Sequence, residues 1–193
     1  MKKMYWLLPL FLLTALTVHG QVQKGSFLLG TSVSPVFGRV IPFQPLEEIR
    51  FGYLLKDNLA LGLEIGYQHY SFSNDNGFLH DADKLSAGLF ARYFLGKGEA
   101  KLKPFVQTSI GLSHWWGTFS RQNEDYSWTS YQDSFQQFYA KMGGGLAYFL
   151  HPNVSLEVSM YKTLDFGNGY TDFGNSGINF GLNVHFGGKK ERE

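Results

Sequence analysis

The chain has 193 residues, a length typical of one domain. Charged residues make up 17% and aromatic residues another 17%, with 23 glycines and no cysteine. This is poorer in charge than an average soluble domain, and the lack of cysteine excludes disulfides, thiolate metal sites and a lipidated cysteine. The formal net charge of +1 gives no reason to expect a nucleic acid as a partner.

Residues 1–20 have the features of a cleavable secretory signal peptide. Two lysines near the start precede an apolar run from Tyr5 to Val18, and Val18 and Gly20 offer small residues at a cleavage site. The run is shorter than the roughly 20 residues that a membrane-spanning helix needs. We therefore expect export, with residues 21–193 as one mature domain. No later segment is long and apolar enough for such a helix, so a mature chain that spans a membrane must use strands.

After the signal, apolar residues recur at every second position, and this pattern appears eight times. The apolar rows run over Phe27–Val33, Ile49–Leu55, Leu59–Tyr67, Leu85–Leu95, Val106–Trp116, Ala140–Leu150, Val154–Met160 and Ile178–Phe186. Short links near Asp57, Gly98 and Pro152 alternate with longer links at 37–46, 71–83, 117–134 and 164–176. An even number of strands with short turns at one end and long loops at the other is typical of membrane barrels. The sequence predicts an all-β fold, an eight-stranded antiparallel up-and-down transmembrane β-barrel with its short turns in the periplasm.

The residues between the apolar ones decide which face meets lipid. This second row is rich in small residues, namely Gly52, Ala60, Gly62, Gly66, Ser86, Gly88, Ser109, Gly111, Gly143, Gly145, Ser159 and Gly181. Glycine weakens a strand and packs nothing, so a glycine-rich exterior is hard to explain in a soluble barrel of the lipocalin kind. A narrow eight-stranded lumen, in contrast, has room only for side chains. We expect the small row inside and the apolar row in lipid.

Six polar residues interrupt the small row: Arg50, Glu64, Arg92, Gln107, Lys141 and Glu157. If the hairpins are symmetric about their turns, Arg50 lies opposite Glu64. The same assumption places Arg92 opposite both Glu64 and Gln107. Directly opposed side chains are about 5 Å apart, which allows pairing. We expect a lateral polar network that plugs the lumen, although asymmetric loops would make this register accidental. A narrow pore through the network is the alternative.

The last predicted strand, Ile178–Phe186, alternates apolar residues up to a terminal aromatic ring. Together with the secretory signal, the eight strands and the charged lumen, it makes the chain resemble the OmpA/OmpX-type family of small eight-stranded outer-membrane barrels over Gly25–Phe186. This resemblance implies a place in the outer membrane, contact with lipid and lipopolysaccharide, and recognition of the last strand by the barrel-assembly machinery. It implies an architecture and leaves the function open.

One short motif raises the possibility of catalysis. His69-Tyr70-Ser71 is similar to the His-x-Ser element of the outer-membrane lipid A deacylases. That resemblance would make His69 the base, Ser71 the nucleophile and Asp81 or Asp83 the carboxylate that orients the histidine. Phe72 stands where asparagine is expected, however, and an interfacial histidine is the favoured interpretation. We expect no enzyme activity, no cofactor and no metal site, because no two histidines share a strand face at ligand spacing.

The expected loop at 117–134 is rich in rings: Phe119, Tyr126, Trp128 and Tyr131. Tyr and Trp give a large contact area at low entropic cost, so this loop is the expected surface for an extracellular protein or another surface ligand. The alternative is that these rings only anchor the barrel at the lipopolysaccharide boundary. The sequence thus favours a structural or adhesive outer-membrane barrel, with a lipid A-modifying enzyme or a narrow pore as the alternatives.

Overall fold

The computed structural model describes residues 22–34, 48–73, 79–96, 100–122, 127–167, 170–172 and 176–187. The expected signal peptide lies outside these residues. Among the described residues, no helix is long and apolar enough to cross a membrane.

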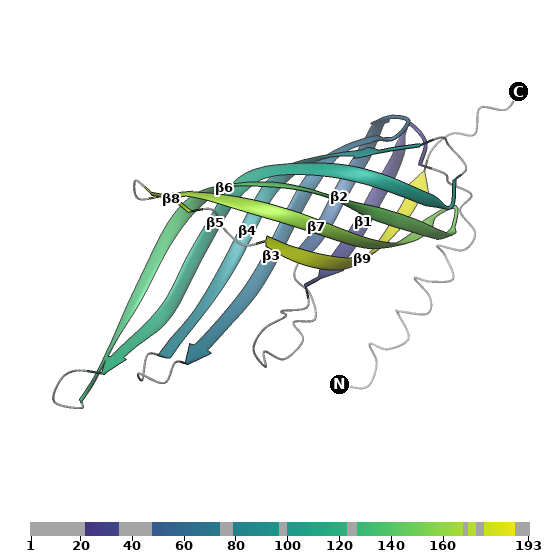
Figure 1. Cartoon of the computed structure of the whole chain (residues 1–193). Coiled ribbons are helices and arrows are strands. Elements are labelled where there is room, and N and C mark those ends of the chain that lie inside the picture. Colours follow the sequence, from purple (N-terminus) through teal and green to yellow (C-terminus); the bar gives the residue numbers. More distant parts are fainter. Residues whose placement is uncertain are drawn as a thin grey trace, which may run out of the picture.

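The described residues form nine strands joined into one sheet (Figure 1). They are β1 (Ser26–Val33), β2 (Glu48–Lys56), β3 (Leu59–Ser73), β4 (Leu79–Phe94), β5 (Leu102–Gln122), β6 (Trp128–His151), β7 (Val154–Gly167), β8 (Tyr170–Asp172) and β9 (Ser176–Gly187). From β1 to β7 each strand pairs with the next in antiparallel fashion, and β9 pairs with both β7 and β1. Eight strands therefore close a ring, and the short β8 adds a pairing at the outer end of β7. The predicted fold is confirmed.

Tight connections lie at one end of the ring, which we call the short-turn end. Asp57 and Asn58 join β2 to β3, and Asn58 has a φ of 71°, a left-handed conformation that asparagine tolerates better than most residues. Pro152 and Asn153 form the turn between β6 and β7. The first residue of β1, Ser26, pairs with the last residue of β9, Gly187, at this same end. The opposite end of the barrel is called the outer end below.

The apolar row points away from the barrel axis. Leu63, Leu89 and Met142 expose 57%, 58% and 71% of their surfaces, whereas Leu54 and Arg92 in the other row expose none. Large exposed apolar patches are rare on soluble monomers. The predicted arrangement, with the apolar row facing lipid and the small residues inside, is therefore confirmed. The alternative of a soluble barrel with its apolar row inside is wrong.

Three of the expected loops consist mostly of strand residues. Most of 71–83 and of 117–134 belongs to strands, because β3 and β4 reach Ser73 and Leu79 and the β5–β6 hairpin extends to Gln122 and Trp128. Most of 164–176 also belongs to strands, since it contains the end of β7, all of β8 and the first residue of β9. Their polar composition suggested loops, yet a strand outside the membrane is solvated on both faces and needs no apolar row.

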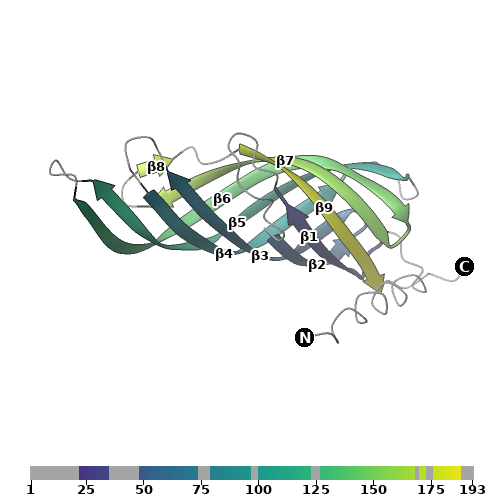
Figure 2. The same ribbon diagram turned by 90° about the horizontal axis from the view of Figure 1, so that it is seen from below.

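The extra length builds a second feature of the fold. Within the described residues, the pairing of β3 with β2 ends at Gly66, and that of β6 with β7 ends at Phe138. Outside these positions the four strands β3 to β6 continue as one sheet that projects from the barrel (Figures 1 and 2). We call this sheet the outer arm, made of residues 67–73, 79–85, 114–122 and 128–137.

Candidate functional site

An apolar layer fills the lumen near the short-turn end. Its members are buried and in mutual contact: Val22, Leu28, Leu54, Ala60, Phe90, Phe94, Phe105, Ala147 and Phe149. The ring centroids of Phe94 and Phe105 lie 5.9 Å apart, and those of Phe149 and His185 5.5 Å. Sequence reasoning missed this layer. The signal was present, since phenylalanine stands at several positions of the row otherwise made of small residues.

Arg92 occupies the centre of the lumen and is fully buried. Its Nη1 donates to Glu157 Oε1 at 2.6 Å, while its Nε and Nη2 donate to Gln107 Oε1 at 2.9 and 2.6 Å. The guanidinium carbon lies 4.3 Å from the ring centroid of Phe105. Arg92 therefore joins the polar network to the apolar layer.

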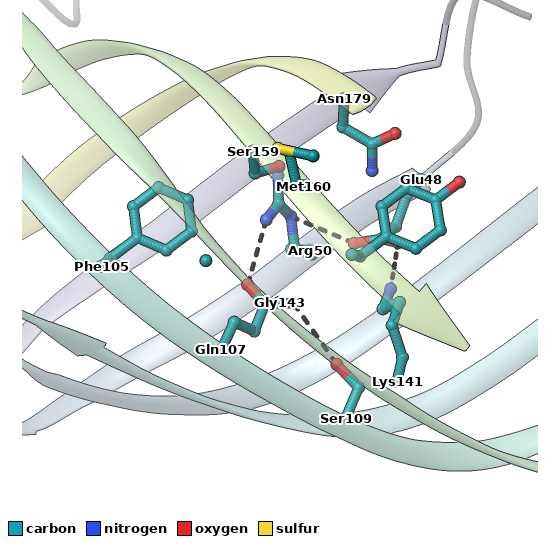
Figure 3. A pocket seen from close by; sticks show the side chains of 12 residues that line it. Glu48, Arg50, Phe105, Gln107, Ser109, Lys141, Gly143, Ser159, Met160 and Asn179 are labelled. Atoms are coloured by element: carbon teal, nitrogen blue, oxygen red, sulfur yellow. Dashed lines mark hydrogen bonds and ion pairs between the residues drawn. The ribbon is translucent and has the colours of Figure 1, made fainter. Parts of the chain in front are cut away.

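Arg50 on β2 brings a fourth strand into the network. Its Nη1 donates to Gln107 Oε1 at 3.2 Å, and its Nη2 lies 3.6 Å from Glu157 Oε2. Its Nε lies 3.3 Å from Glu48 Oε1. The carboxylate of Glu48 thus lies between Arg50 and Lys141, as Figure 3 shows.

Lys141 connects two carboxylates on the far side of the network. Its Nζ lies 2.5 Å from Glu48 Oε2 and 2.9 Å from Glu64 Oε1. Glu64 also accepts hydrogen bonds from the Ser109 hydroxyl at 2.9 Å and the Tyr139 hydroxyl at 3.1 Å. The Glu64 carboxylate, itself on β3, is therefore held by side chains from both β5 and β6.

Two glycines make room for the ring of Tyr139. Gly88 and Gly111 are cross-strand partners on β4 and β5. A Cβ added to Gly111 would lie 2.8 Å from Tyr139 Cε1 and 2.6 Å from the Cα of Gly88. Real Cβ atoms do not approach so closely, so glycine at this pair lets the Tyr139 hydroxyl reach Glu64.

The structure brings all six polar residues named from the sequence into one network. It adds Glu48 and Tyr139, which sequence reasoning missed, and Ser109, which the sequence placed in the inward row only as a small residue. Glu48 directly precedes Ile49 and alternates with it, like Arg50. Starting the second predicted strand one residue earlier would therefore have placed Glu48 in the inward row. The charged members are three cations (Arg50, Arg92, Lys141) and three carboxylates (Glu48, Glu64, Glu157), so their formal charges cancel. A balanced, hydrogen-bonded set is what burial of charge requires.

The predicted register is right for two strand pairs and wrong for one. Arg50 pairs with Glu64, and Arg92 pairs with Gln107, as expected. Glu64, however, pairs with Gly88, four residues away from Arg92. The hairpin is symmetric about position 76, since Ser73 pairs with Leu79, and not about Phe78. A centre displaced by two residues shifts the register by four.

Two small cavities lie in the described part of the lumen. One cavity of about 20 Å³ lies among Arg50, Gln107 and Lys141 (Figure 3). Another of about 50 Å³ lies nearer the outer end, beside Gln68 and Lys84. One water needs about 10–15 Å³ of such cavity volume. The two cavities are therefore large enough for a few waters and too small for a larger solute.

His69 lies on the outside of β3, at the base of the outer arm. Its Nδ1 is 2.9 Å from Asp83 Oδ1, and its Nε2 is 3.3 Å from Asp81 Oδ1. The Tyr67 hydroxyl donates to Asp83 Oδ1 at 2.6 Å. Asp83 lies beyond the apolar row of β4, which begins at Leu85. The hydrogen bonds that it accepts from Tyr67 and His69 hold the pKa of its carboxyl below its usual range.

One of the contacts expected for a catalytic role of His69 is present. Asp83 meets His69 as an orienting carboxylate would, but the second ring nitrogen faces Asp81, where a base would meet its nucleophile. Ser71 pairs with Asp81 along the backbone, and its side chain lies outside the described residues. Among the described residues, no group of three or more His, Cys, Asp or Glu could hold a metal ion.

The four rings expected in a loop have different positions. Tyr131 lies on β6 and is half exposed. Phe119 and Trp128 lie on β5 and β6, with side chains outside the described set, and Tyr126 lies outside the described residues altogether. The ring-rich segment is therefore mainly the hairpin of the outer arm.

Residues 45–190 match a family model described as the OprF membrane domain. No curated protein sequence matches the chain. Among solved structures, the chain is similar to the N-terminal β-barrel domain of Pseudomonas aeruginosa OprF, with 20% identity over 84% of this chain and 98% of that chain and a TM-score of 0.51. Neisserial surface protein A is 15% identical over 82% of this chain and 94% of its own, with a TM-score of 0.53.

A major outer membrane protein from Thermus thermophilus is 12% identical over 85% of this chain and 100% of its own, with a TM-score of 0.61. At such identities these likenesses show a common fold. The family match covers most of the chain and confirms the resemblance to small outer-membrane barrels. The chain belongs to the OprF membrane-domain family and is an outer-membrane β-barrel protein.

Proposed function

We propose that this protein is a closed, non-catalytic barrel that contacts partners outside the cell through its outer arm. The observation that carries the proposal is strand length. β5 has 21 residues and β6 has 24, whereas a membrane-crossing strand needs about 9–11. A barrel that served only to span the membrane would not need this excess, which forms a surface beyond the apolar rows.

The lumen supports a closed barrel over a pore. An electroneutral polar layer crosses it, and the apolar layer lies between that network and the short turns. Hydrophobic constrictions oppose the passage of water and ions because they favour a dewetted state. The position of His69, with a carboxylate at each ring nitrogen, supports a structural role for that histidine over a catalytic one.

The test shortens the outer arm without touching the barrel. Trp116 and Ser134 are cross-strand partners, so residues 117–133 can be replaced by a two-residue turn. We expect the shortened protein to keep the heat-modifiable gel migration of a folded barrel. Cells displaying the parent should attach to surfaces coated with polysaccharide or serum protein, and cells displaying the shortened form should not.

Two further measurements separate the alternatives. In planar lipid bilayers the parent should show no resolved channel steps, and with purified lipid A it should release no fatty acid. Equal attachment by parent and shortened forms would contradict the role of the arm, while regular conductance steps or fatty-acid release would favour the pore or the enzyme.

A further inference from the structure

The outward side of the outer arm carries a shallow groove of about 460 Å³. Three adjacent strands line it: Asp81 and Asp83 from β4, Trp116, Gly117 and Thr118 from β5, and Gln132, Asp133 and Ser134 from β6. The volume lies within the range of about 300–1,000 Å³ that is usual for small-ligand sites. It is much larger than either cavity in the lumen.

The groove is a regular patch of the sheet and not a gap between loops. One cross-strand row contains Asp83, Trp116 and Ser134, and the next contains Asp81, Thr118 and Gln132. Between the rows lies Gly117, whose added Cβ would be 2.8 Å from both the Cα and the Cβ of Ala82. Only glycine allows β4 and β5 to lie this close, so the floor has a fixed shape.

The groove opens just above the membrane boundary. The row before it contains Tyr67 and Leu85, which are exposed on the lipid side. Two residues along a strand rise about 7 Å. The groove therefore faces the layer of lipid headgroups in the outer leaflet and the solution directly above it.

The side chains that line the groove suit a sugar ring. Trp116 is 36% exposed, and His114 stacks beside it with ring centroids 5.5 Å apart and an interplanar angle of 27°. An exposed indole can pack against the apolar C–H face of a pyranose. The carboxylates accept hydrogen bonds from sugar hydroxyls, and the Gln132 amide and the two hydroxyl side chains can both donate and accept.

Charge narrows the class of sugar. Among the described residues that line the groove, three are acidic (Asp81, Asp83 and Asp133) and none is a lysine or an arginine. His69 contacts both Asp81 and Asp83, and we assign it as a positioning residue for these two carboxylates. Acidic sugars and sugar phosphates would face like charges here.

We propose that this groove binds a neutral pyranose, with Trp116 as the stacking platform and Asp81, Asp83 and Gln132 as hydrogen-bonding partners. The inference deepens the proposed function, because it names a ligand class for one face of the outer arm. The same sugar chemistry is offered by a neutral glycolipid in the membrane and by a soluble polysaccharide.

The test uses the full protein in micelles of a detergent without sugar, such as lauryl dimethylamine oxide. Glucose, galactose and N-acetylglucosamine are titrated by saturation-transfer NMR, with glucuronate as the acidic comparison. We expect saturable transfer from at least one neutral sugar and at least several-fold weaker binding of glucuronate. Trp116→Ala should weaken the affinity by about tenfold, as removal of one aromatic anchor does.

Trp115→Phe is the matched control, because the neighbouring Trp115 faces the other side of the sheet and stacks on Phe135. It should bind sugar like the parent. His69→Ala should weaken the binding of neutral sugars less than Trp116→Ala does, because His69 only positions Asp81 and Asp83. The His69→Ala variant should bind glucuronate no more tightly than the parent does, because both carboxylates remain. All variants are first checked for heat-modifiable migration, so that loss of fold is not mistaken for loss of binding.

Two further probes identify the source of the sugar. Vesicles of phosphatidylcholine with a neutral glycolipid test the headgroup, and neutral oligosaccharides test the soluble glycan. Binding of either supports the site. The proposal is overturned if no neutral sugar or glycolipid binds, if Trp116→Ala binds like the parent, or if glucuronate binds better than glucose. Such failure would leave intact an arm that binds proteins, which the shortened-arm experiment tests separately.

Discussion

Arg92 is the largest fully buried side chain among the described residues, and it bridges Gln107 and Glu157 in the lumen. Arg92→Met keeps most of the volume but removes a charge from the Glu157 carboxylate. Breaking a buried ion pair costs roughly 3–5 kcal/mol. We expect a loss of about 3 kcal/mol in the free energy of unfolding, at the low end because Arg50 also faces Glu157. Urea unfolding in lipid vesicles measures it, with the exposed Lys56→Met as the control that should change little.

Coupling between pairs of residues tests the structure of the network more sharply. The carboxylate of Glu64 lies 2.9 Å from Lys141 Nζ. Arg92 is not the cross-strand partner of Glu64, because the register of β3 and β4 places Arg92 opposite Ala60. Contacting charges typically show coupling energies of about 0.5–3 kcal/mol in double-mutant cycles. We expect coupling in that range for Glu64→Gln with Lys141→Met, and a smaller coupling for Glu64→Gln with Arg92→Met, because Gln107 lies between Glu64 and Arg92 and binds both. The reverse result would restore the symmetric register about Phe78.

At the scale of the strand, the outward row makes a prediction about insertion. Leu63 and Leu89 are cross-strand partners near the middle of their apolar rows. Arginine at the bilayer midplane costs roughly 2–4 kcal/mol in membrane barrels. Leu63→Arg should therefore reduce folding into vesicles by that amount, followed by heat-modifiable migration. Ser134→Arg is the matched control, because it lies on the same outward face but above the boundary. Equal tolerance of both changes would mean that Leu63 does not face lipid.

The strands and their faces could be predicted because a membrane barrel needs different side chains at alternate positions of each strand. Lipid demands apolar side chains at every second position, and the narrow lumen demands small ones between them. The outer arm lacks this contrast, since water meets both of its faces, and so Ser73 and Gln122 gave no sign of belonging to strands. Elements were therefore predictable where the membrane covers them and not beyond it.

The network was predictable in membership and only partly in register. Parity alone brings Arg50, Lys141 and Glu157 to the inner face, and a short turn fixes the pairing of Arg50 with Glu64. The link between β3 and β4 contains Asn76-Gly77, a dipeptide typical of tight hairpin turns. Centring the hairpin on this dipeptide instead of on Phe78 would have come close to the observed centre at position 76. The closeness of Lys141 to Glu48 depends on the curvature of the closed ring, which brings β6 opposite β2 across the lumen.

At the scale of the whole molecule, ring closure and filling of the lumen act together. Closure leaves no unpaired strand edge at membrane depth, where each unsatisfied backbone group would be costly. The filled lumen then supports the wall from inside, with polar contacts in the middle and packed rings toward the short turns. Among the described strands, the outer ends of β3 to β6 extend beyond this arrangement as the outer arm, and we expect changes there to leave the fold intact.

The two layers of the lumen predict how the barrel responds when one of them is weakened. Lys141→Met disrupts the polar layer by removing the cation that joins Glu48 to Glu64, while Phe94, Phe105 and Phe149 still close the lumen near the short turns. Phe94→Ala with Phe149→Ala opens the apolar layer but leaves the ion pairs of Arg92 and Lys141 across the lumen. We expect either change alone to give no resolved conductance in planar bilayers, because each remaining layer still blocks ions. The combined variant should show channel openings, provided it retains heat-modifiable migration. Conductance by Lys141→Met alone would show that the packed rings do not seal the barrel, and a silent combined variant would show that a third part of the lumen does.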